Sequence, residues 1–252
     1  MAASRFVYGI GPVRELLQSR AKSVAVLYVV EGKGKGVELV QMARDRRVVV
    51  EEVSRPAIDQ LVPGVNHQGA VAIAGEFQYA DVDDMLDLAE QRGESPLLVA
   101  ADGVTDPHNL GAIMRSAYLL GAHGVIVPRN RAAGVTAVAT KVSAGASEHL
   151  AVAQVTNLVR VLGELKESDV WTAAAVGGER SIPPWQLDGN MGLCIVVGSE
   201  GAGIRKLVAK QCDFKVGIPM TGTAVGSFNV SVATSLLLYE VARQRSERAA
   251  RS

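Results

Sequence analysis

The sequence predicts an α/β protein built around a mainly parallel sheet. Short runs of β-branched residues alternate with longer helical patterns from one end of the chain to the other, which is typical of βαβ units. Hydrophobic residues fill 48% of the 252 positions, enough for a sizeable core and too many for a disordered chain. The expected strands are 24–30, 48–53, 97–104, 124–127, 170–176, 193–198 and 214–220. The expected helices are 13–20, 36–47, 110–120, 137–148, 158–167, 204–211 and 229–245.

An acidic stretch interrupts this alternation and divides the chain. Residues 76–95 hold seven acidic residues and one basic residue. Residues 1–75 hold ten basic and seven acidic ones, and residues 96–252 hold fifteen and twelve. The three segments therefore carry formal charges of +3, −6 and +3. We interpret 76–95 as an acidic linker between a small α/β domain, 1–75, and a larger one, 96–252.

The overall composition excludes several classes of protein. The 26 basic residues match 26 acidic ones, which argues against a DNA-coating protein and against a polybasic membrane binder. Two cysteines cannot form a disulfide framework or a zinc site alone, and the four histidines show no ligand spacing, so we expect no metal. The N-terminus lacks a signal peptide, and no apolar run approaches the roughly 20 residues of a membrane-spanning helix. We therefore expect a cytoplasmic protein.

Glycine-rich stretches exclude familiar cofactor signatures by their spacing. The stretch 198–203 has glycines at offsets 0, 3 and 5, whereas the dinucleotide fingerprint needs 0, 2 and 5. Neither a phosphate-binding G-x-x-x-x-G-K-[ST] nor a G-x-S-x-G nucleophile turn is present. The segment 29–36, with Lys33 and Lys35 among glycines, is a flexible basic loop that suits a phosphate backbone and a solvated turn equally well.

The expected strand 97–104 leads into a helix that carries two polar residues of interest. Apolar residues recur from Leu110 at the i, i+3, i+4, i+7 spacing, so Arg115 points away from the core. Asn109 stands where an N-cap belongs, and capping is its simplest role. By itself, Arg115 is as consistent with a surface arginine as with a functional one.

Two later strand ends also carry polar, glycine-rich loops. Strand 193–198 runs into a tight turn that lets another group approach the backbone. Glu200 lies there at the positive end of the next helix, and dipole compensation alone explains it. The last loop leads into a helix that opens with Ser227, Asn229 and Ser231, and capping explains one of these residues but hardly all three. Open α/β sheets bind ligands beyond the carboxyl ends of their strands, so these loops predict one shared pocket.

These three segments resemble the motifs of the SpoU/TrmH family of RNA ribose 2′-O-methyltransferases, in the SPOUT superfamily. The three motifs resemble Asn109-x-x-Gly111-x-x-x-Arg115, Gly198-Ser-Glu-Gly-x-Gly203, and Ile218-Pro-Met followed by Ser227-x-Asn229-Val-Ser231. Near the N-terminus, Tyr8-Gly-Ile-Gly-Pro-Val-Arg14 and His67-Gln-Gly69 resemble the substrate-binding domain of members that methylate a guanosine in bacterial large-subunit rRNA. The resemblance covers nearly the whole chain.

The resemblance implies a fold, a cofactor and partners. It implies a C-terminal domain with a trefoil knot, an N-terminal domain like ribosomal L30e, S-adenosylmethionine (AdoMet) as methyl donor, and a homodimer with the active site near its interface. RNA is the expected partner, most plausibly large-subunit rRNA, with no membrane and no DNA. The alternatives are a tRNA site, a resistance-type rRNA site, or a non-catalytic RNA-binding module that keeps the fold.

The resemblance also assigns residues to roles. The implied catalytic residues are Asn109, Arg115, Glu200 and Asn229. The implied cofactor-binding residues are Gly198, Ile218, Met220, Ser227 and Phe228. The expected RNA-binding residues are Arg14, Lys33, Lys35, His67 and Gln68. An arginine stays protonated in proteins, so we expect Arg115 to clamp a phosphate or stabilise a developing alkoxide, and the general base stays open.

Three positions depart from the family pattern. The loop 221–226 is one residue longer than usual, Phe228 replaces the usual leucine, and Gly11 stands where histidine is common. None of these departures removes an implied catalytic side chain.

Overall fold

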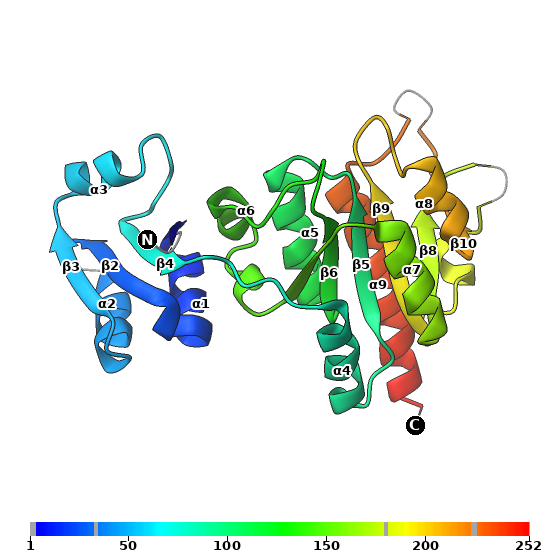
Figure 1. Cartoon of the computed structure of the whole chain (residues 1–252), viewed down its shortest axis with the longest axis horizontal. Helices are drawn as coiled ribbons and strands as arrows, with labels where there is room; N and C mark the ends of the chain where they lie inside the picture. Colours follow the sequence, from blue (N-terminus) through cyan, green and yellow to red (C-terminus); the bar gives the residue numbers. More distant parts are fainter. Residues whose placement is uncertain (1–3, 33–34, 179–180, 223–225, 252) are drawn as a thin grey trace. The chain divides into compact units, whose positions relative to one another are not determined.

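The computed structural model describes residues 4–32, 35–178, 181–222 and 226–251 (Figure 1). Internal contacts divide the chain into two compact units, which we describe separately. Unit 1 consists of Met1–Gln78 and Val135–His149, and unit 2 consists of Tyr79–Gly134 and Leu150–Ser252. The segment Val135–His149 thus belongs to unit 1 by its contacts, although it lies far along the sequence, inside the larger predicted domain.

Unit 1 contains a four-stranded mixed sheet in the order β1-β4-β2-β3. Its strands are β1 Ser4–Tyr8, β2 Val24–Val30, β3 Val49–Val53 and β4 Ala70–Gly75. Its helices are α1 Ile10–Arg20, η1 Ala21–Ser23, α2 Lys35–Asp45, α3 Arg55–Leu61, α6 Ala137–Val142 and η2 Ala146–Glu148. Only β2 and β3 run parallel. Helices α1 and α2 share one hydrophobic core with the sheet, and α3 joins a second core that Ala137 of α6 completes.

Unit 2 contains a six-stranded sheet in the order β10-β8-β9-β5-β6-β7, and every adjacent pair is parallel. Its strands are β5 Leu97–Asp102, β6 Gly124–Pro128, β7 Ala151–Val155, β8 Val170–Ala175, β9 Gly192–Gly198 and β10 Phe214–Val216. Its helices are α4 Val82–Arg92, α5 Pro107–Leu119, α7 Leu158–Glu167, η3 Pro184–Gln186, α8 Lys206–Gln211 and α9 Val230–Ala249. Helices α4, α7 and α8 cover one face, and α5 and α9 pack together on the other (Figure 1). The predicted α/β class with a parallel sheet is confirmed, while the knot and the L30e likeness stay predictions.

Several elements differ from the sequence-based expectation for local reasons. The expected strand 214–220 ends at Val216, because Gly217 donates to Ile182 and Pro219 has no N–H to continue the ladder. The expected helix 137–148 breaks at Gly145, which has a φ of +91°. The strands β1, β4 and β7 were not expected at all.

The acidic stretch is largely helical. Helix α4 opens with a capping box in which Asp84 accepts a hydrogen bond from the backbone N–H of Asp81 at 2.8 Å. Its side chains Met85 and Ala89 are fully buried, and Met85 belongs to the core under the parallel sheet. This helix is therefore part of unit 2 and is not solvated on all sides. Across the described residues, no helix is both long enough and apolar enough to span a bilayer.

Candidate functional site

The site of unit 2 lies where the two central strands of its sheet end. Strands β5 and β9 are neighbours, and the last residue of each, Asp102 and Gly198, are partners in register. From β5 the chain builds β6 and β7 on one side, whereas β9, β8 and β10 lie on the other. This reversal of strand order is the point at which open parallel sheets form ligand crevices.

Three predicted catalytic residues meet through side-chain hydrogen bonds. The Nδ2 of Asn109, on α5, donates to Oε1 of Glu200 at 3.1 Å. The Nδ2 of Asn229 donates to Oδ1 of Asn109 at 2.9 Å and also to Oε1 of Glu200. Asn109 lies in the first turn of α5, Glu200 in the turn after β9, and Asn229 at the N-cap of α9, so the polar trio Asn109–Glu200–Asn229 ties together all three segments singled out in the sequence.

Helix capping or dipole compensation, the simpler explanation for each member of the trio, holds for one of the three residues only. The N-cap of α5 is Asp106, which accepts from the backbone N–H of His108 at 2.9 Å, so the capping interpretation of Asn109 is wrong. Glu200 precedes the first residue of α8 by six positions, which leaves dipole compensation without a basis. Asn229 does cap α9, because its Oδ1 accepts from the backbone N–H and the hydroxyl of Ser231 at 2.9 and 2.6 Å.

The glycine turn after β9 is closed by its own backbone hydrogen bonds and is tied to the end of β5 by an ion pair. The backbones of Ser199 and Gly203 exchange two hydrogen bonds, and a Cβ on Gly198 would lie 2.1 Å from the carbonyl carbon of Gly203, so no other residue fits there. Arg205, just after the turn, donates from its backbone N–H and its Nε to the buried Asp102 at 2.8 and 2.7 Å. This pair links the end of β5 to the turn and holds Glu200 near Asn109.

A cavity of about 490 Å³ opens beside the trio. All five predicted cofactor-binding residues line it, together with Glu200 and parts of the strand ends. The remaining lining is mostly backbone and small or apolar side chains: Ala175, Val176, Gly177, Val197, Ser199, Gly201, Gly203, Val216, Gly226, Val230 and Ala233. Its size suits a drug-sized ligand, since such pockets measure about 300–1,000 Å³. The loop 221–226, predicted to be one residue longer than usual, includes positions 223–225, which lie outside the described residues.

The fourth predicted catalytic residue stands apart from the trio. Arg115 lies six residues further along α5 than Asn109, and its side chain is exposed. Within the described ranges, no hydrogen bond or ion pair involves it. The structure thus brings together Asn109, Glu200 and Asn229 and leaves Arg115 available to a ligand.

The predicted RNA-binding residues lie in unit 1 and differ in exposure. Arg14 and Gln68 line a second cavity, of about 680 Å³. His67 is 1% exposed, and its two ring nitrogens bond Asp59 at 2.8 Å and the backbone N–H of Gly69 at 3.0 Å. It therefore shapes the turn that presents Gln68 and does not itself face a ligand. Lys33 lies outside the described residues, and Lys35 begins α2.

This combination of a parallel sheet, a cofactor-sized cavity at its switch point and a polar trio beside that cavity defines an α/β enzyme that transfers a group from a bound cofactor. The chain belongs to the SpoU rRNA methylase family: that family's model matches residues 96–239, and the model for RNA 2′-O ribose methyltransferase substrate binding matches residues 6–80. The predicted family, and with it the RNA ribose 2′-O-methyltransferase class, are confirmed.

Individual relatives resemble nearly the whole chain. It is 42% identical over 242 residues to the putative TrmH family tRNA/rRNA methyltransferase YacO of Bacillus subtilis, covering 95% of this chain and 96% of the relative. It is 40% identical over 245 residues to the 23S rRNA (guanosine-2′-O-)-methyltransferase RlmB of Yersinia pestis, covering 96% and 98%. The crystal structure of the SpoU methyltransferase AviRb from Streptomyces viridochromogenes with the cofactor AdoMet matches with a TM-score of 0.80 at 26% identity, covering 97% and 91%. That complex confirms the predicted methyl donor for the family.

Sequence reasoning missed two contributors. The clamp between Asp102 and Arg205 joins residues 103 positions apart, and only the acidic end of a buried strand hinted at it. Lys141 lines the cavity of unit 1 and donates to Gln68 at 2.8 Å. No local pattern relates these two residues.

Proposed function

We propose that this protein methylates a ribose 2′-hydroxyl of a guanosine in 23S rRNA, with AdoMet as the methyl donor, in the cytoplasm where that RNA is assembled. One observation carries the proposal: the trio Asn109–Glu200–Asn229 borders the cavity that Gly198, Ile218 and Phe228 line. The full-length similarity to enzymes named for the 23S rRNA guanosine reaction supports the choice of substrate.

The lining of the unit 2 cavity fits AdoMet by its chemistry. Backbone groups near Gly198 and Ile218 suit the polar edges of the cofactor, and Met220 and Phe228 expose 46% and 41% of their surface for its flat rings. Ser227 adds a hydroxyl, and the carboxylate of Glu200 suits a cationic group. When bound, AdoMet supplies an electrophilic methyl group on a sulfonium.

The chain's own residues then orient the acceptor ribose. Asn109 and Asn229 hold Glu200 in one position, and a fixed geometry is the main requirement for activating a weak nucleophile such as a hydroxyl. Arg115 is always cationic, so it binds a phosphate of the RNA or stabilises negative charge on the attacking oxygen. We assign it no proton transfer.

A methylation assay tests the function. Unmodified 23S rRNA and total tRNA, each made in vitro, are incubated with the enzyme and radiolabelled AdoMet, and ribose methylation is then mapped in both. We expect one methylated guanosine in 23S rRNA. Methylation of tRNA instead would reassign the substrate, and AdoMet binding by calorimetry without any methylation would favour a non-catalytic RNA-binding module.

We also propose that the protein is a homodimer joined through α5 and α9. These helices pack together and expose apolar side chains: Leu119 is 68% exposed, Leu236 41% and Tyr239 60%. The same two helices carry Arg115 and Asn229, so a second copy there would border the site. Light scattering should give twice the chain mass, and Leu236→Glu should give the monomer with little activity. A fully active wild-type monomer would contradict the dimer.

The trefoil knot is a further proposal for the segment 198–229, supported by the family's motifs in it. These residues include both loops that line the cavity of unit 2, at 198–203 and 218–228. An experimental chain trace that passes through no loop of the remaining chain would contradict it.

A further inference from the structure

We propose that the cavity of unit 1 binds a single unpaired nucleotide of the substrate RNA, held by Gln68 and Lys141. This inference rests on the proposed function for the identity of the RNA, but its site is separate from the methyl-transfer residues. The cavity is large enough for a base, ribose and phosphate, since pockets for ligands of this size measure about 300–1,000 Å³.

The cavity is assembled from six places in the sequence, all within unit 1. They are the start of α1, the end of β2, the starts of α2 and α3, the turn before β4, and helix α6 with the residues after it. The lining residues are Ile10, Gly11, Pro12, Arg14, Val29, Val30, Glu31, Gly36, Arg55, Gln68, Gly69, Lys141 and Ala144. Apolar walls from Val29, Val30 and Pro12 combine with charged groups, so the cavity offers apolar contact to a base and cations to its phosphate.

The position of Gln68 is fixed by its neighbours. It adopts a φ of +55°, and the buried His67 on one side bonds both Asp59 and the backbone of Gly69. Its Oε1 accepts from Lys141 Nζ at 2.8 Å and from the backbone N–H of Ile10 at 3.3 Å. The amide nitrogen donates no hydrogen bond to any described residue. Two oriented N–H donors thus stay available for the acceptor groups of a base, which RNA offers when it is unpaired.

Three cations give the cavity its charge preference. Arg14, Arg55 and Lys141 line it together with the carboxylate of Glu31, and Arg14 also forms an ion pair with Glu38 at 2.9 Å, so three cations stand against two carboxylates. The ammonium of Lys141 lies over Gly9, where a Cβ would come within 2.1 Å of Nζ, and burial lowers the pKa of this lysine from its usual range. A partly desolvated ammonium gains more from a phosphate than a solvated one does, because the attraction is less screened.

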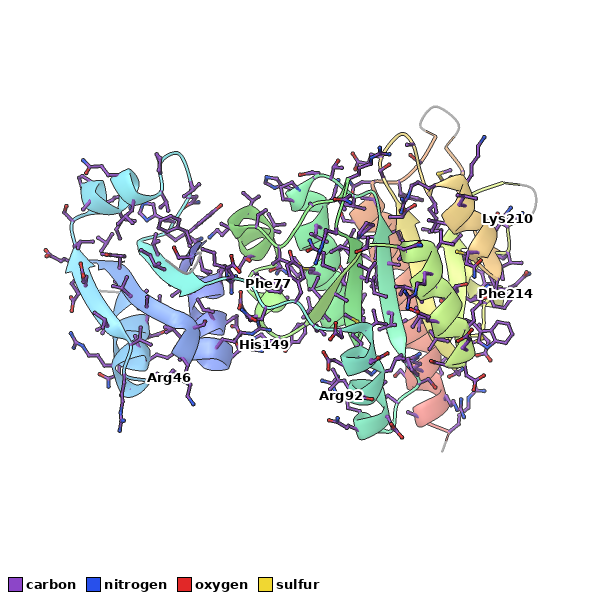
Figure 2. All side chains as sticks on the ribbon, viewed as in Figure 1. Arg46, Phe77, Arg92, His149, Lys210 and Phe214 are labelled. Carbon is purple, nitrogen blue, oxygen red and sulfur yellow. The ribbon has the colours of Figure 1, made fainter. Side chains whose placement is uncertain are left out.

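Lys141 reaches this cavity because its segment is anchored to unit 1. Arg5 of β1 forms an ion pair at 2.9 Å with Glu148, whose side chain is completely buried, and the ring of Phe77 lies 5.3 Å from the Arg5 guanidinium. His149 bonds Glu15 of α1 at 2.8 Å; Figure 2 labels His149 and Phe77. The matched substrate-binding region ends at residue 80, and Lys141 lies within the matched methylase region. One bound nucleotide would therefore contact residues from both matched regions.

Binding measurements on the full-length protein test the inference. The probe is unmodified 23S rRNA transcribed in vitro, and its dissociation constant is measured by filter binding at one fixed salt concentration. We expect Lys141→Met and Gln68→Asn each to weaken binding about tenfold, since the first removes the ammonium and the second draws the carboxamide back from the nucleotide by one methylene. Asparagine tolerates the positive φ at position 68, so this variant keeps the turn. Lys141→Arg should restore most of the affinity.

The control variant is Lys22→Met, which removes an exposed cation from η1, outside the cavity. We expect it to change RNA affinity by no more than about twofold. AdoMet affinity by calorimetry and the thermal unfolding midpoint should match wild type in every variant.

Each outcome separates the inference from the proposed function. If Lys141→Met and Gln68→Asn bind RNA as Lys22→Met does while the wild type methylates it, the inference is overturned and the function stands. If the wild type methylates no RNA, the function fails, and an affinity loss confined to the cavity variants still supports the binding site. The cavity could also bind a free nucleotide in place of a nucleotide of RNA, and calorimetry with GMP and AMP distinguishes these two ligands. Tight binding of a free nucleotide, with unchanged RNA affinity in the variants, would overturn the RNA assignment.

Discussion

The cavity of unit 2 is lined by loops that each follow a strand, whereas the cavity of unit 1 takes Gln68 and Lys141 from regions 73 residues apart. In the first, the loops after β9 and β10 each carry a recognisable pattern, because glycine turns and helix starts constrain neighbouring residues. In the second, Arg14 and Gln68 lie in recognisable segments, but nothing in the sequence relates either of them to Lys141. The difference shows why the methyl-transfer site can be predicted from motifs, whereas the cavity of unit 1 can be predicted only in part.

The largest loss of methylation rate should come from replacing Arg115. This variant tests whether a residue outside the trio takes part in methyl transfer. Arg115→Ala should lower the methylation rate by at least about 10²-fold, because it removes the charge that holds phosphate or alkoxide. AdoMet affinity by calorimetry should stay within a few-fold, since Arg115 does not line that cavity. Single-turnover kinetics measures the rate. Wild-type turnover in this variant would remove Arg115 from the site.

A smaller effect is expected at Asn229, where two roles can be separated. Asn229→Asp keeps the Oδ1 that caps α9, loses the N–H donors to Asn109 and Glu200, and places a second carboxylate beside that of Glu200, so the rate should fall about tenfold to 10²-fold. Asn229→Ala loses both roles and should also cost about 1 kcal/mol of folding stability. Kinetics and thermal unfolding of both variants check this. Equal activity in wild type and Asn229→Asp would show that the trio only caps the helix.

Breaking the ion pair between Asp102 and Arg205, which holds the glycine turn, should have a moderate effect that is confined to unit 2. Arg205→Ala removes the guanidinium from the buried carboxylate of Asp102 and leaves it only the backbone N–H of residue 205, which should cost about 2 kcal/mol of unfolding free energy. AdoMet should bind more weakly, and 23S rRNA affinity should be unchanged. The matched control is Lys206→Ala, the exposed neighbour, which should leave both ligands unaffected. If RNA affinity fell in Arg205→Ala alone, the two cavities would not be independent.

The smallest effect is expected from the acidic helix α4. Asp83 and Asp87 are exposed, so Asp83→Asn with Asp87→Asn should raise non-specific RNA affinity about twofold at low salt by removing repulsion of phosphate. Asp81 and Asp84 are spared, because their capping box would be lost with them. Filter binding with an unrelated RNA measures the change. Unchanged affinity would show that this charge does not face bound RNA.

The sequence was sufficient to predict the elements whose pattern lies in neighbouring residues. The central strands β5 and β9 are apolar runs buried along nearly their whole length, and the trio follows from motifs at their ends. The strands β1 and β4 escaped prediction although they are as long as strands that were predicted; in the described part of the chain β1 pairs only with β4, and β4 lies between β1 and β2, so both depend on partners far along the sequence. The role of His67 also needed the fold, since a histidine in a turn can equally be exposed or, as here, locked between Asp59 and Gly69.

The contacts between residues of distant segments were not predicted for the same reason. Asp102 and Arg205 form their clamp only after β5 and β9 have paired, and Lys141 meets Gln68 only after α6 has packed on unit 1. Such contacts form between residues that are far apart in the sequence, whereas periodicity and capping rules describe only neighbouring residues.

The anchoring of Val135–His149 to unit 1 has a consequence for synthesis. A domain encoded by one continuous stretch can fold as soon as that stretch leaves the ribosome. Unit 1 cannot, because Glu148, the partner of Arg5, is made long after the first 78 residues, when β5, α5 and β6 of the other unit already exist. During translation the nascent chain therefore carries unit 1 without Lys141, and the cavity of unit 1 is completed only when about a third of unit 2 has been made.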